Sequence, residues 1–283
     1  MLPASELILH PDGSVYHLGL RPEDVADTVL VVGDPERVVR ITRHFDRIER
    51  RVQRREFVTH TGQLGPKRLT VVSSGIGTDN VEILLTELDA LVNVDLARRE
   101  IKAEKKRLRF IRIGTSGSLQ PDVPVDSHLC AASAIGLDTL MCFYPLPQIE
   151  PELVLARRLQ QHLGLPFRPY CVSGSAALRA QFGPEMMEGH TLTCPGFYAP
   201  QGRQIRLSPA IPALVEALSG FRQGEYRLTN FEMETAGYYA LCRMLGHDAI
   251  SLNAIVAHRL THEFSANPEK VVDDLIRNVL EKV

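Results

Sequence analysis

The stretch Thr28-Val-Leu-Val-Val-Gly33, followed directly by Asp34-Pro-Glu-Arg37, decides the fold of this chain. Residues 28–32 are β-branched or aliphatic, which is typical of a strand buried on both faces. Gly33 allows the backbone to turn closely, and a helix can begin immediately afterwards. A buried strand that turns into a helix is the repeating unit of α/β folds.

Outside this stretch, the same alternation of strand and helix patterns continues along the chain. Further buried strands are expected at RLTVVSSG (68–75), FIRIGTSG (110–117) and SLNAIVA (251–257). Apolar residues recur at helical spacing in Asn80–Leu91, Glu152–Leu163, Glu234–Leu245 and Pro268–Val283. We found no internal repeat, low-complexity linker or sharp change in composition. The sequence therefore predicts a layered α/β fold in a single domain over residues 1–283.

The composition is that of an ordinary soluble protein without a global charge signal. The chain has 283 residues, 44% of them hydrophobic, and a net charge of −2, so no general attraction to nucleic acid or anionic membrane is expected. Its five cysteines show no CxxC pair or zinc-like spacing, which favours reduced thiols in a cytosolic protein. The N-terminus lacks the pattern of a signal peptide, and no run approaches the roughly 20 apolar residues of a spanning helix. A cytoplasmic location is expected.

One segment is strongly basic. Residues 97–109 contain seven Lys or Arg residues and two Glu residues. A nucleic-acid patch is one interpretation, but no aromatic residues are interleaved with the charges. A solvated helix or loop is the favoured interpretation.

Two motifs at strand ends have the properties of an anion site. Amides after Gly33 can face an anion at a helix start, and Arg37 can supply a charged fork that matches phosphate oxygens. Arg112 lies in an otherwise apolar strand and needs a partner if it is buried. Thr115 stands next to it in a Gly-Thr-Ser-Gly loop at the end of that strand, where ligands of α/β sheets collect. The alternative interpretations are a plain turn with an exposed arginine in each place.

A third motif, FYAPQGR (197–203), contains groups suited to a flat polar ring. Phe197 can stack on such a ring, and the amide of Gln201 can pair with an adjacent donor and acceptor on it. Arg203 can hold a carbonyl oxygen that becomes negative. The alternative is a surface loop rich in proline and glycine.

A fourth motif places two carboxylates on either side of a methionine, Glu232-Met233-Glu234. Carboxylates accept hydrogen bonds from neighbouring sugar hydroxyls, and methionine offers a soft surface for the face of a sugar. Acidic residues that serve a helix N-terminus are the alternative, which explains Glu234 better than the pair. His258-Arg259 ends another expected strand and is a weak signal alone.

Together these motifs resemble, in order and over nearly the whole chain, the nucleoside phosphorylase-I family, and within it most closely the uridine phosphorylases. The stretches that carry the resemblance are VYHLGL (15–20), GDPERV (33–38), RREF (54–57), SSGIGTDN (73–80), RIGTSGSLQ (112–120), FYAPQGR (197–203), FEMETA (231–236) and IVAHR (255–259).

The resemblance implies one three-layer α/β/α domain with a twisted central mixed β-sheet. It implies cleavage of uridine by inorganic phosphate to uracil and ribose 1-phosphate, with phosphate as co-substrate and no other cofactor. Arg112, Glu234 and Arg203 would have the catalytic roles. The phosphate-binding positions would be Gly33, Arg37, Arg112 and Thr115, with Arg55 from a neighbouring subunit.

The resemblance also assigns the remaining ligand positions. Ribose would contact Met233, Glu234 and His17 of the partner chain, and uracil would contact Phe197, Gln201 and Arg203, with Glu232 and Arg259 lining the site. Such shared sites imply a homo-oligomer, either a dimer or a hexamer of dimers. No metal is assigned, although some family members hold a monovalent cation near the positions of Glu56 and Ser73.

Two alternative functions are a purine-nucleoside phosphorylase or nucleoside hydrolase of the same superfamily and a non-catalytic nucleoside-binding protein, and one observation weighs against each. Purine-specific relatives and hydrolases place an aspartate after the last core strand, whereas this chain has Val256-Ala257-His258-Arg259 there. A non-catalytic nucleoside-binding protein is expected to lose a phosphate arginine or one of the paired acids, and all are present. The chain departs from the family where a Gly-Asp pair usually follows the phosphate loop, because Asp126-Ser127 stands there.

Overall fold

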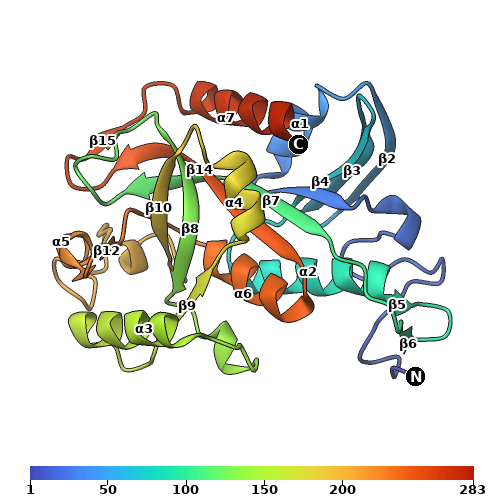
Figure 1. The fold of residues 1–283 in the computed structure, drawn as a ribbon, viewed down its shortest axis with the longest axis horizontal. Helices are drawn as coiled ribbons and strands as arrows, with labels where there is room; N and C mark the ends of the chain where they lie inside the picture. Colours follow the sequence, from blue (N-terminus) through green and yellow to red (C-terminus); the bar gives the residue numbers. More distant parts are fainter. The chain divides into compact units, whose positions relative to one another are not determined.

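The computed structural model describes all residues from Met1 to Val283, which form two compact units (Figure 1). Unit 1 consists of Met1–Ile111 and Leu245–Asp248, and unit 2 of Arg112–Met244 and Ala249–Val283. The expectation of one domain over the whole chain stays a prediction.

Unit 1 is built on the strands β1, β4, β3 and β2, in that order. Strand β1 (Thr28–Val32) pairs in parallel with β4 (Lys67–Ser73), and β3 (Phe57–Leu64) runs antiparallel to both β4 and β2 (Arg47–Arg54). All five residues of β1 are buried, as an interior strand requires, whereas the charged β2 is mostly exposed.

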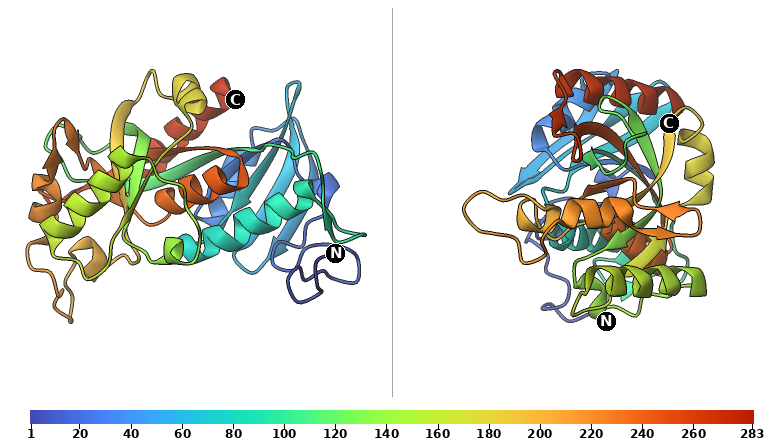
Figure 2. Two further views of the ribbon diagram at one scale, coloured as in Figure 1. Left: turned by 60° about the horizontal axis from the view of Figure 1, so that its bottom comes forward. Right: turned by 90° about the vertical axis from the view of Figure 1, so that its left-hand side faces the viewer.

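The helices of unit 1 follow the predicted pattern. Helix α1 (Pro35–Thr42) packs on β3 and β4, and α2 (Thr78–Asn93), teal in Figure 2, is the longest helix of this unit. The remaining elements are the 3-10 helix η1 (Pro22–Asp24) and the short paired strands β5 (Val94–Asp95) and β6 (Glu100–Ile101).

Unit 2 carries a larger mixed sheet. Its strand order is β15, β14, β8, β10, β13 and β7, with β9 also on β8. The strands β8, β10 and β13 are parallel. Strand β7 is antiparallel to β13, β9 is antiparallel to β8, and β14 is antiparallel to β8 and β15. Their bounds are β7 (Arg109–Ser118), β8 (His128–Gly136), β9 (Tyr170–Ser173), β10 (Met187–Thr193), β13 (Asn230–Glu232), β14 (Asp248–His258) and β15 (Glu263–Phe264).

The helices of unit 2 are α3 (Glu150–Leu163), α4 (Ala176–Phe182), α5 (Leu214–Gly220), α6 (Thr235–Leu245) and α7 (Pro268–Lys282). Helices α3 and α5 pack in one buried cluster with residues of β8 and β10, among them Ile135 and Leu192. Short elements complete the unit: η2 (Leu140–Cys142), η3 (Ala199–Gln201), β11 (Arg222–Gln223) and β12 (Tyr226–Arg227).

The elements predicted from periodicity are confirmed. The four expected helices are α2, α3, α6 and α7, and the four expected strands are β1, β4, β7 and β14, with ends that shift by a few residues. The strands that the pattern missed include β2, which is charged on both faces, and β8, which is rich in small residues. Neither has the aliphatic run that marks a buried strand.

Most of the basic segment 97–109 is an exposed loop that includes β6, so the expected solvated loop is confirmed up to Arg107, whereas Leu108 is buried and Arg109 begins β7. Several of its charges bind backbone oxygens in the same unit. The Arg99 guanidinium donates to the carbonyls of Leu2, Pro3 and Leu7, and the Lys102 ammonium donates to that of Val92 at 2.8 Å. These contacts tie the N-terminal segment of the chain to the loop.

The unusual Asp126 adopts a left-handed backbone conformation, with φ of +69°. Glycine tolerates this region best, and Asn and Asp adopt it more readily than other residues do. Here Asp126 is held by two contacts: its amide donates to the Ile255 carbonyl at 2.8 Å, and its carboxylate accepts from the Ser265 hydroxyl at 2.5 Å.

None of the helices combines the length and the apolar character that crossing a membrane would need.

Candidate active site

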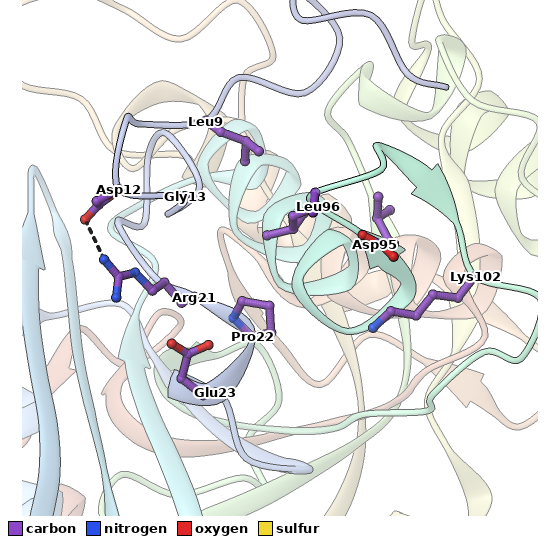
Figure 3. A pocket seen from close by; sticks show the side chains of 11 residues that line it. Leu9, Asp12, Gly13, Arg21, Pro22, Glu23, Asp95, Leu96 and Lys102 are labelled. Atoms are coloured by element: carbon purple, nitrogen blue, oxygen red, sulfur yellow. Dashed lines mark ion pairs between the residues drawn. The ribbon is translucent and has the colours of Figure 1, made fainter.

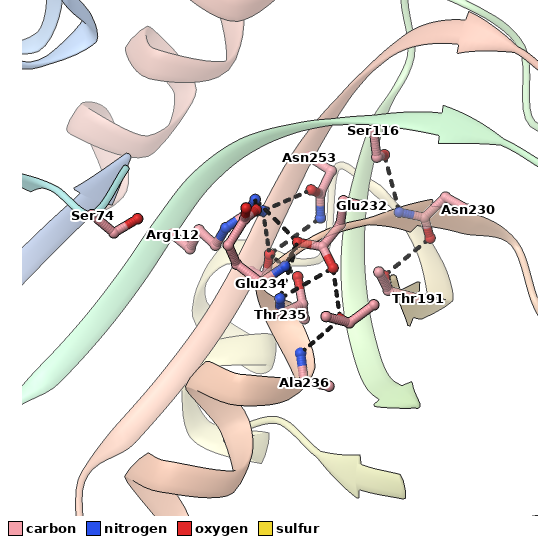
Figure 4. A network of polar contacts seen from close by, with 12 residues as sticks. Ser74, Arg112, Ser116, Thr191, Asn230, Glu232, Glu234, Thr235, Ala236 and Asn253 are labelled. Carbon is pink, nitrogen blue, oxygen red and sulfur yellow. Dashed lines mark hydrogen bonds and ion pairs between the residues drawn. The ribbon is translucent and has the colours of Figure 1, made fainter. Parts of the chain in front are cut away.

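In unit 2, the buried side chain of Arg112 on β7 faces two carboxylates (Figure 4). Its Nη2 lies 3.0 Å from Glu232 Oε2 and 2.5 Å from Glu234 Oε2. Burial disfavours a charged guanidinium, but the negative charges of Glu232 and Glu234 outweigh that effect and raise the pKa of Arg112 above its ordinary value. The predicted anion and sugar motifs are thus joined through one arginine.

The other edge of Arg112 is held by Ser251 and Asn253 of β14, two residues that the sequence analysis did not identify as part of the site. Arg112 Nη1 donates to Ser251 Oγ at 3.2 Å and to Asn253 Oδ1 at 3.1 Å. Gly114 makes room for this arrangement, because a Cβ there would stand 2.0 Å from Arg112 Nη1. The two polar residues in the run SLNAIVA (251–257) were the available signal, since a polar side chain inside a buried strand needs a partner.

Glu232 and Glu234 meet different groups. Both oxygens of Glu232 accept hydrogen bonds from the protein: from the Thr193 hydroxyl at 2.7 Å, from the Glu234 amide at 2.9 Å and from the Thr235 amide. Glu232 therefore satisfies amides at the start of α6, the role that the helix-terminus interpretation had given to Glu234. Met233, between them, is partly exposed.

The loop after β10 brings together the three residues predicted to bind a flat ring. Arg203 Nη1 donates to Gln201 Oε1 at 2.6 Å and to the Phe197 carbonyl at 2.7 Å, and its guanidinium lies 3.7 Å from the Phe197 ring centroid. Gln201 is only 3% exposed, although it lies in a loop, whereas the Phe197 ring is half exposed. The interpretation as a plain surface loop fails for Gln201.

Arg259, at the end of β14, adds a second cation in the same unit. Its guanidinium lies 5.4 Å from the Phe231 ring centroid, and Gly117 lets its stem pass, because a Cβ there would stand 3.3 Å from Arg259 Cγ. Burial is the main cause that lowers the pKa of Arg203 to about 10, and repulsion from Arg259 adds to it. Burial also lowers the pKa of Arg259. Two arginines repel each other here, which favours a negatively charged or strongly polar ligand.

The neighbouring His258 has a structural contact. Its Nε2 lies 3.1 Å from the Gln120 carbonyl, and the side chain is buried.

The other residues that were predicted to bind phosphate are divided between the two units. In unit 1, Gly33 and Arg37 lie at the start of α1, where Asp34 caps the helix by accepting from the Glu36 amide at 2.9 Å. Thr115 belongs to unit 2 and is partly buried, and the expectation of a Gly-Thr-Ser-Gly loop was wrong, because residues 114–117 continue strand β7 up to Ser118. A common phosphate site for these residues stays a prediction.

The residues expected to come from a partner chain lie in unit 1. Arg55 is at the turn between β2 and β3, exposed and with φ of +52°, and its guanidinium lies 5.8 Å from the Tyr16 ring centroid. His17 is partly exposed, and its Nδ1 lies 2.6 Å from Glu87 Oε1.

Glu56 and Ser73, near which a monovalent cation was expected, are in contact, because Ser73 Oγ donates to the Glu56 carbonyl at 2.5 Å. That cation stays a prediction, and the chain shows no cluster of three or more His, Cys, Asp or Glu side chains that could hold a metal ion.

A cavity of about 540 Å³ in unit 1 contains none of the predicted site residues (Figure 3). It is lined by apolar residues such as Leu9 and Leu96 and by charges of both signs, with Arg21 3.4 Å from Asp12. Its mixed charges do not indicate one class of ligand.

Comparisons with known proteins identify the family of the chain. The family model described as the phosphorylase superfamily matches residues 27–281. The chain is 32% identical over 260 residues to a uridine phosphorylase of Thermococcus kodakarensis, which covers 92% of this chain and 83% of that protein. It is 27% identical over 255 residues to the uridine phosphorylase of Escherichia coli, with 88% of each chain covered.

Among solved structures, the chain superposes on a Trypanosoma brucei nucleoside phosphorylase, described as showing uridine phosphorylase activity. The TM-score is 0.89 at 27% identity, with 98% of both chains covered. The match of fold, the match over most of the sequence and the joined motifs lead to one conclusion: this chain belongs to the phosphorylase superfamily and has the α/β fold of a nucleoside phosphorylase.

Proposed function

We propose that this protein is a uridine-type nucleoside phosphorylase, a pentosyltransferase that cleaves uridine with inorganic phosphate to uracil and ribose 1-phosphate. The observation that carries the proposal is the contact of Arg203 with Gln201 beside the Phe197 ring. The names of the relatives above support the same substrate.

The contact between Arg203 and Gln201 suits the edge of uracil. A guanidinium can only donate, so the amide oxygen of Gln201, and not its nitrogen, must face Arg203. Arg203 N–H, Gln201 Oε1 and Gln201 Nε2 then form a donor, an acceptor and a donor in sequence. Uracil presents the complementary order of carbonyl, N–H and carbonyl, whereas cytosine replaces the central donor with an acceptor. Phe197 offers a face on which the ring can stack.

Arg112 and Glu234 suit the sugar and the nucleophile. As the bond from C1′ to uracil N1 breaks, positive charge develops on the ribose, and the Glu234 carboxylate stabilises it and accepts hydrogen bonds from sugar hydroxyls. Arg112 orients phosphate, whose oxygen forms the new bond to C1′. We include Gly33, Arg37 and Thr115, and Arg55 of a partner chain, as further phosphate-binding residues.

The leaving group needs no strong acid. Uracil departs as an anion delocalised over the ring, stabilised by Arg203 and by the charge of Arg259, and then takes up a proton at N1. Phosphate is the only co-substrate in this proposal. The proposal also includes a cytoplasmic homo-oligomer in which His17 and Arg55 complete the site of a neighbouring subunit.

The test is release of free base from uridine, cytidine and inosine, each with and without phosphate. We expect uracil from uridine only when phosphate is present, together with ribose 1-phosphate. Equal release without phosphate would identify a hydrolase, preference for inosine a purine enzyme, and no release with any nucleoside a binding protein. Each of these results overturns the proposal.

A matched pair of variants tests the role of Gln201. Gln201→Ala should lower kcat/KM for uridine by a factor of about 5 to 150, which corresponds to about 1–3 kcal/mol for a buried group left unpaired. Gln204→Ala removes the same group from the exposed part of the loop, where it bonds only Ser208, and should leave kcat/KM unchanged.

A further inference from the structure

We propose that Glu87, on helix α2, is a positioning residue that fixes the tautomer and the ring orientation of His17. The inference deepens the proposed function and rests on it, because that proposal makes His17 a ribose-binding residue. No motif of the sequence analysis included Glu87.

The Glu87 carboxylate binds three N–H groups of two adjacent residues. Glu87 Oε1 lies 2.6 Å from His17 Nδ1, and the His17 amide donates to both carboxylate oxygens at 3.0 Å. The Leu18 amide donates to Glu87 Oε2 at 2.9 Å. One carboxylate therefore binds both the backbone and the ring of His17, which restricts the side chain far more than a single contact would.

The chemistry of the pair determines the proton position on the ring. An ionised carboxylate only accepts, so Nδ1 must carry the hydrogen, and Nε2 is left as an acceptor in the neutral ring. The Glu87 side chain is 12% exposed and that of His17 is 28% exposed. The carboxylate thus holds the inner nitrogen, and the ring keeps an exposed edge on which Nε2 can accept a hydrogen bond from a sugar hydroxyl.

Tyr16 supports the same ring orientation. Its ring meets that of His17 edge to face, with centroids 4.9 Å apart, and stacks on His10 at 5.4 Å. The segment 10–18 is thereby ordered on both sides of His17.

A purely structural role, in which Glu87 only anchors the N-terminal segment, makes a different prediction. In that case a substitution of Glu87 would lower the stability of the protein but would not change the tautomer of the His17 ring. Glu87→Gln separates the two roles, because glutamine keeps the size and can still accept from the backbone amides, but its carboxamide no longer selects one tautomer.

The first measurement is the ring ¹⁵N NMR spectrum of His17, which does not depend on activity. We expect the Nδ1–H tautomer in the unmodified protein and a substantial Nε2–H population in Glu87→Gln. Asp89→Asn is the matched control, since Asp89 lies on the same helix and faces another histidine, His247, at 3.2 Å. It should leave the His17 signals unchanged. An Nε2–H tautomer in the unmodified protein, or no change in Glu87→Gln, overturns the inference.

The second measurement is a double-mutant cycle with uridine and phosphate. Glu87→Gln and His17→Ala should each lower kcat/KM, the former by a factor of about 10 to 100, and Glu87→Gln should add nothing in the His17→Ala background. Equal losses in both backgrounds, or full activity of His17→Ala, overturn the positioning role. If the unmodified protein fails to cleave uridine, the proposed function falls, and the NMR result still decides whether Glu87 selects the tautomer.

Discussion

Two neighbouring glutamates beside Arg112 look equivalent in the sequence, but the structure shows additional hydrogen bonds to Glu232 from the start of α6. Glu232 binds the Thr193 hydroxyl and two amides at the start of α6 as well as the arginine. Glu234, two residues further along the chain, contacts the same guanidinium. We infer that Glu232 holds the local structure in place, while Glu234 acts on the substrate.

Substitution of each acid by glutamine should separate these roles. Glu232→Gln places an NH2 group among donors and leaves buried groups unpaired, so the free energy of unfolding should fall by about 1–3 kcal/mol. Glu234→Gln should lower kcat for uridine phosphorolysis more than it lowers stability, because it removes charge near the cationic sugar. Denaturant unfolding and steady-state kinetics measure the two effects. An unchanged kcat in Glu234→Gln would assign that acid a structural role only.

Among the elements, α3, β9 and α6 of unit 2 are joined by one buried carboxylate, that of Glu152. It accepts hydrogen bonds from the two terminal guanidinium nitrogens of Arg243 on α6, both at 2.7 Å, and from the Ser173 amide on β9 at 3.0 Å. It also accepts from the Ile149 amide at the start of its own helix, at 3.2 Å. Burial alone would raise the pKa of Glu152, but the hydrogen bonds and the charge of Arg243 outweigh it and lower the pKa below its ordinary value of 4.5.

This pKa shift predicts how the contribution of Glu152 to stability depends on pH. Because the folded-state pKa is lower than the unfolded one, the stabilisation is fully present above pH 4.5 and is lost as pH falls through the folded-state pKa. Glu152→Gln should cost about 1–3 kcal/mol at neutral pH, because the carboxylate is buried while the Arg243 side chain is 26% exposed and can still be hydrated. The difference in unfolding free energy between the two proteins should shrink as pH falls below 4.5. A difference that does not depend on pH would show that the charge of Glu152 is unimportant.

The basic loop 97–109 is the second element whose role depends on contacts. Arg99 binds three carbonyls of the N-terminal segment, which continues to His17. These are hydrogen bonds to backbone oxygens within unit 1. The loop is therefore a structural support for the segment that carries His17.

At the scale of the whole molecule, the proposed active unit is a homodimer whose sites are completed by the neighbouring subunit. Arg55 is exposed at a hairpin turn, whereas Arg112 is buried in its own unit. An exposed arginine at the tip of a hairpin is suited to reach a second chain. Two-fold assembly is also the commonest form of oligomer.

Mixing inactive variants tests this shared site. Arg55→Ala should be inactive through the residue that it donates, and Arg112→Ala through its own pocket. After subunit exchange, a mixed dimer retains one site that carries both arginines, so part of the activity should return.

A mixture of Arg112→Ala with Glu234→Gln is the control. Each chain supplies both Arg112 and Glu234 to its own pocket, so every site of the mixed dimer contains one of the two changes and no activity should return. Both mixtures are assayed at the same total protein concentration. We expect the activity of the first mixture, but not that of the control mixture, to exceed the activity of either variant alone. No recovery despite demonstrated exchange, or a fully active monomer in sedimentation, would contradict the shared site.

The sequence by itself determined the α/β class, the main strands and helices, and the family. Periodicity is a local property, so the four helices and the four aliphatic strands could be predicted without knowledge of their neighbours. The motifs FYAPQGR and FEMETA name the residues of a ring site and a sugar site because the residue types themselves carry that chemistry.

Only the tertiary structure decided which of these residues meet and what else holds them. Ser251 and Asn253 bind Arg112 from about 140 positions away along the chain, and Glu87 binds His17 from 70 positions away. The amides of Glu234 and Thr235 at the start of α6 donate to Glu232, a contact that depends on how the chain turns into that helix. Such pairings depend on how strands and helices pack, and side-chain partners that are distant in sequence leave no local pattern from which they could be predicted.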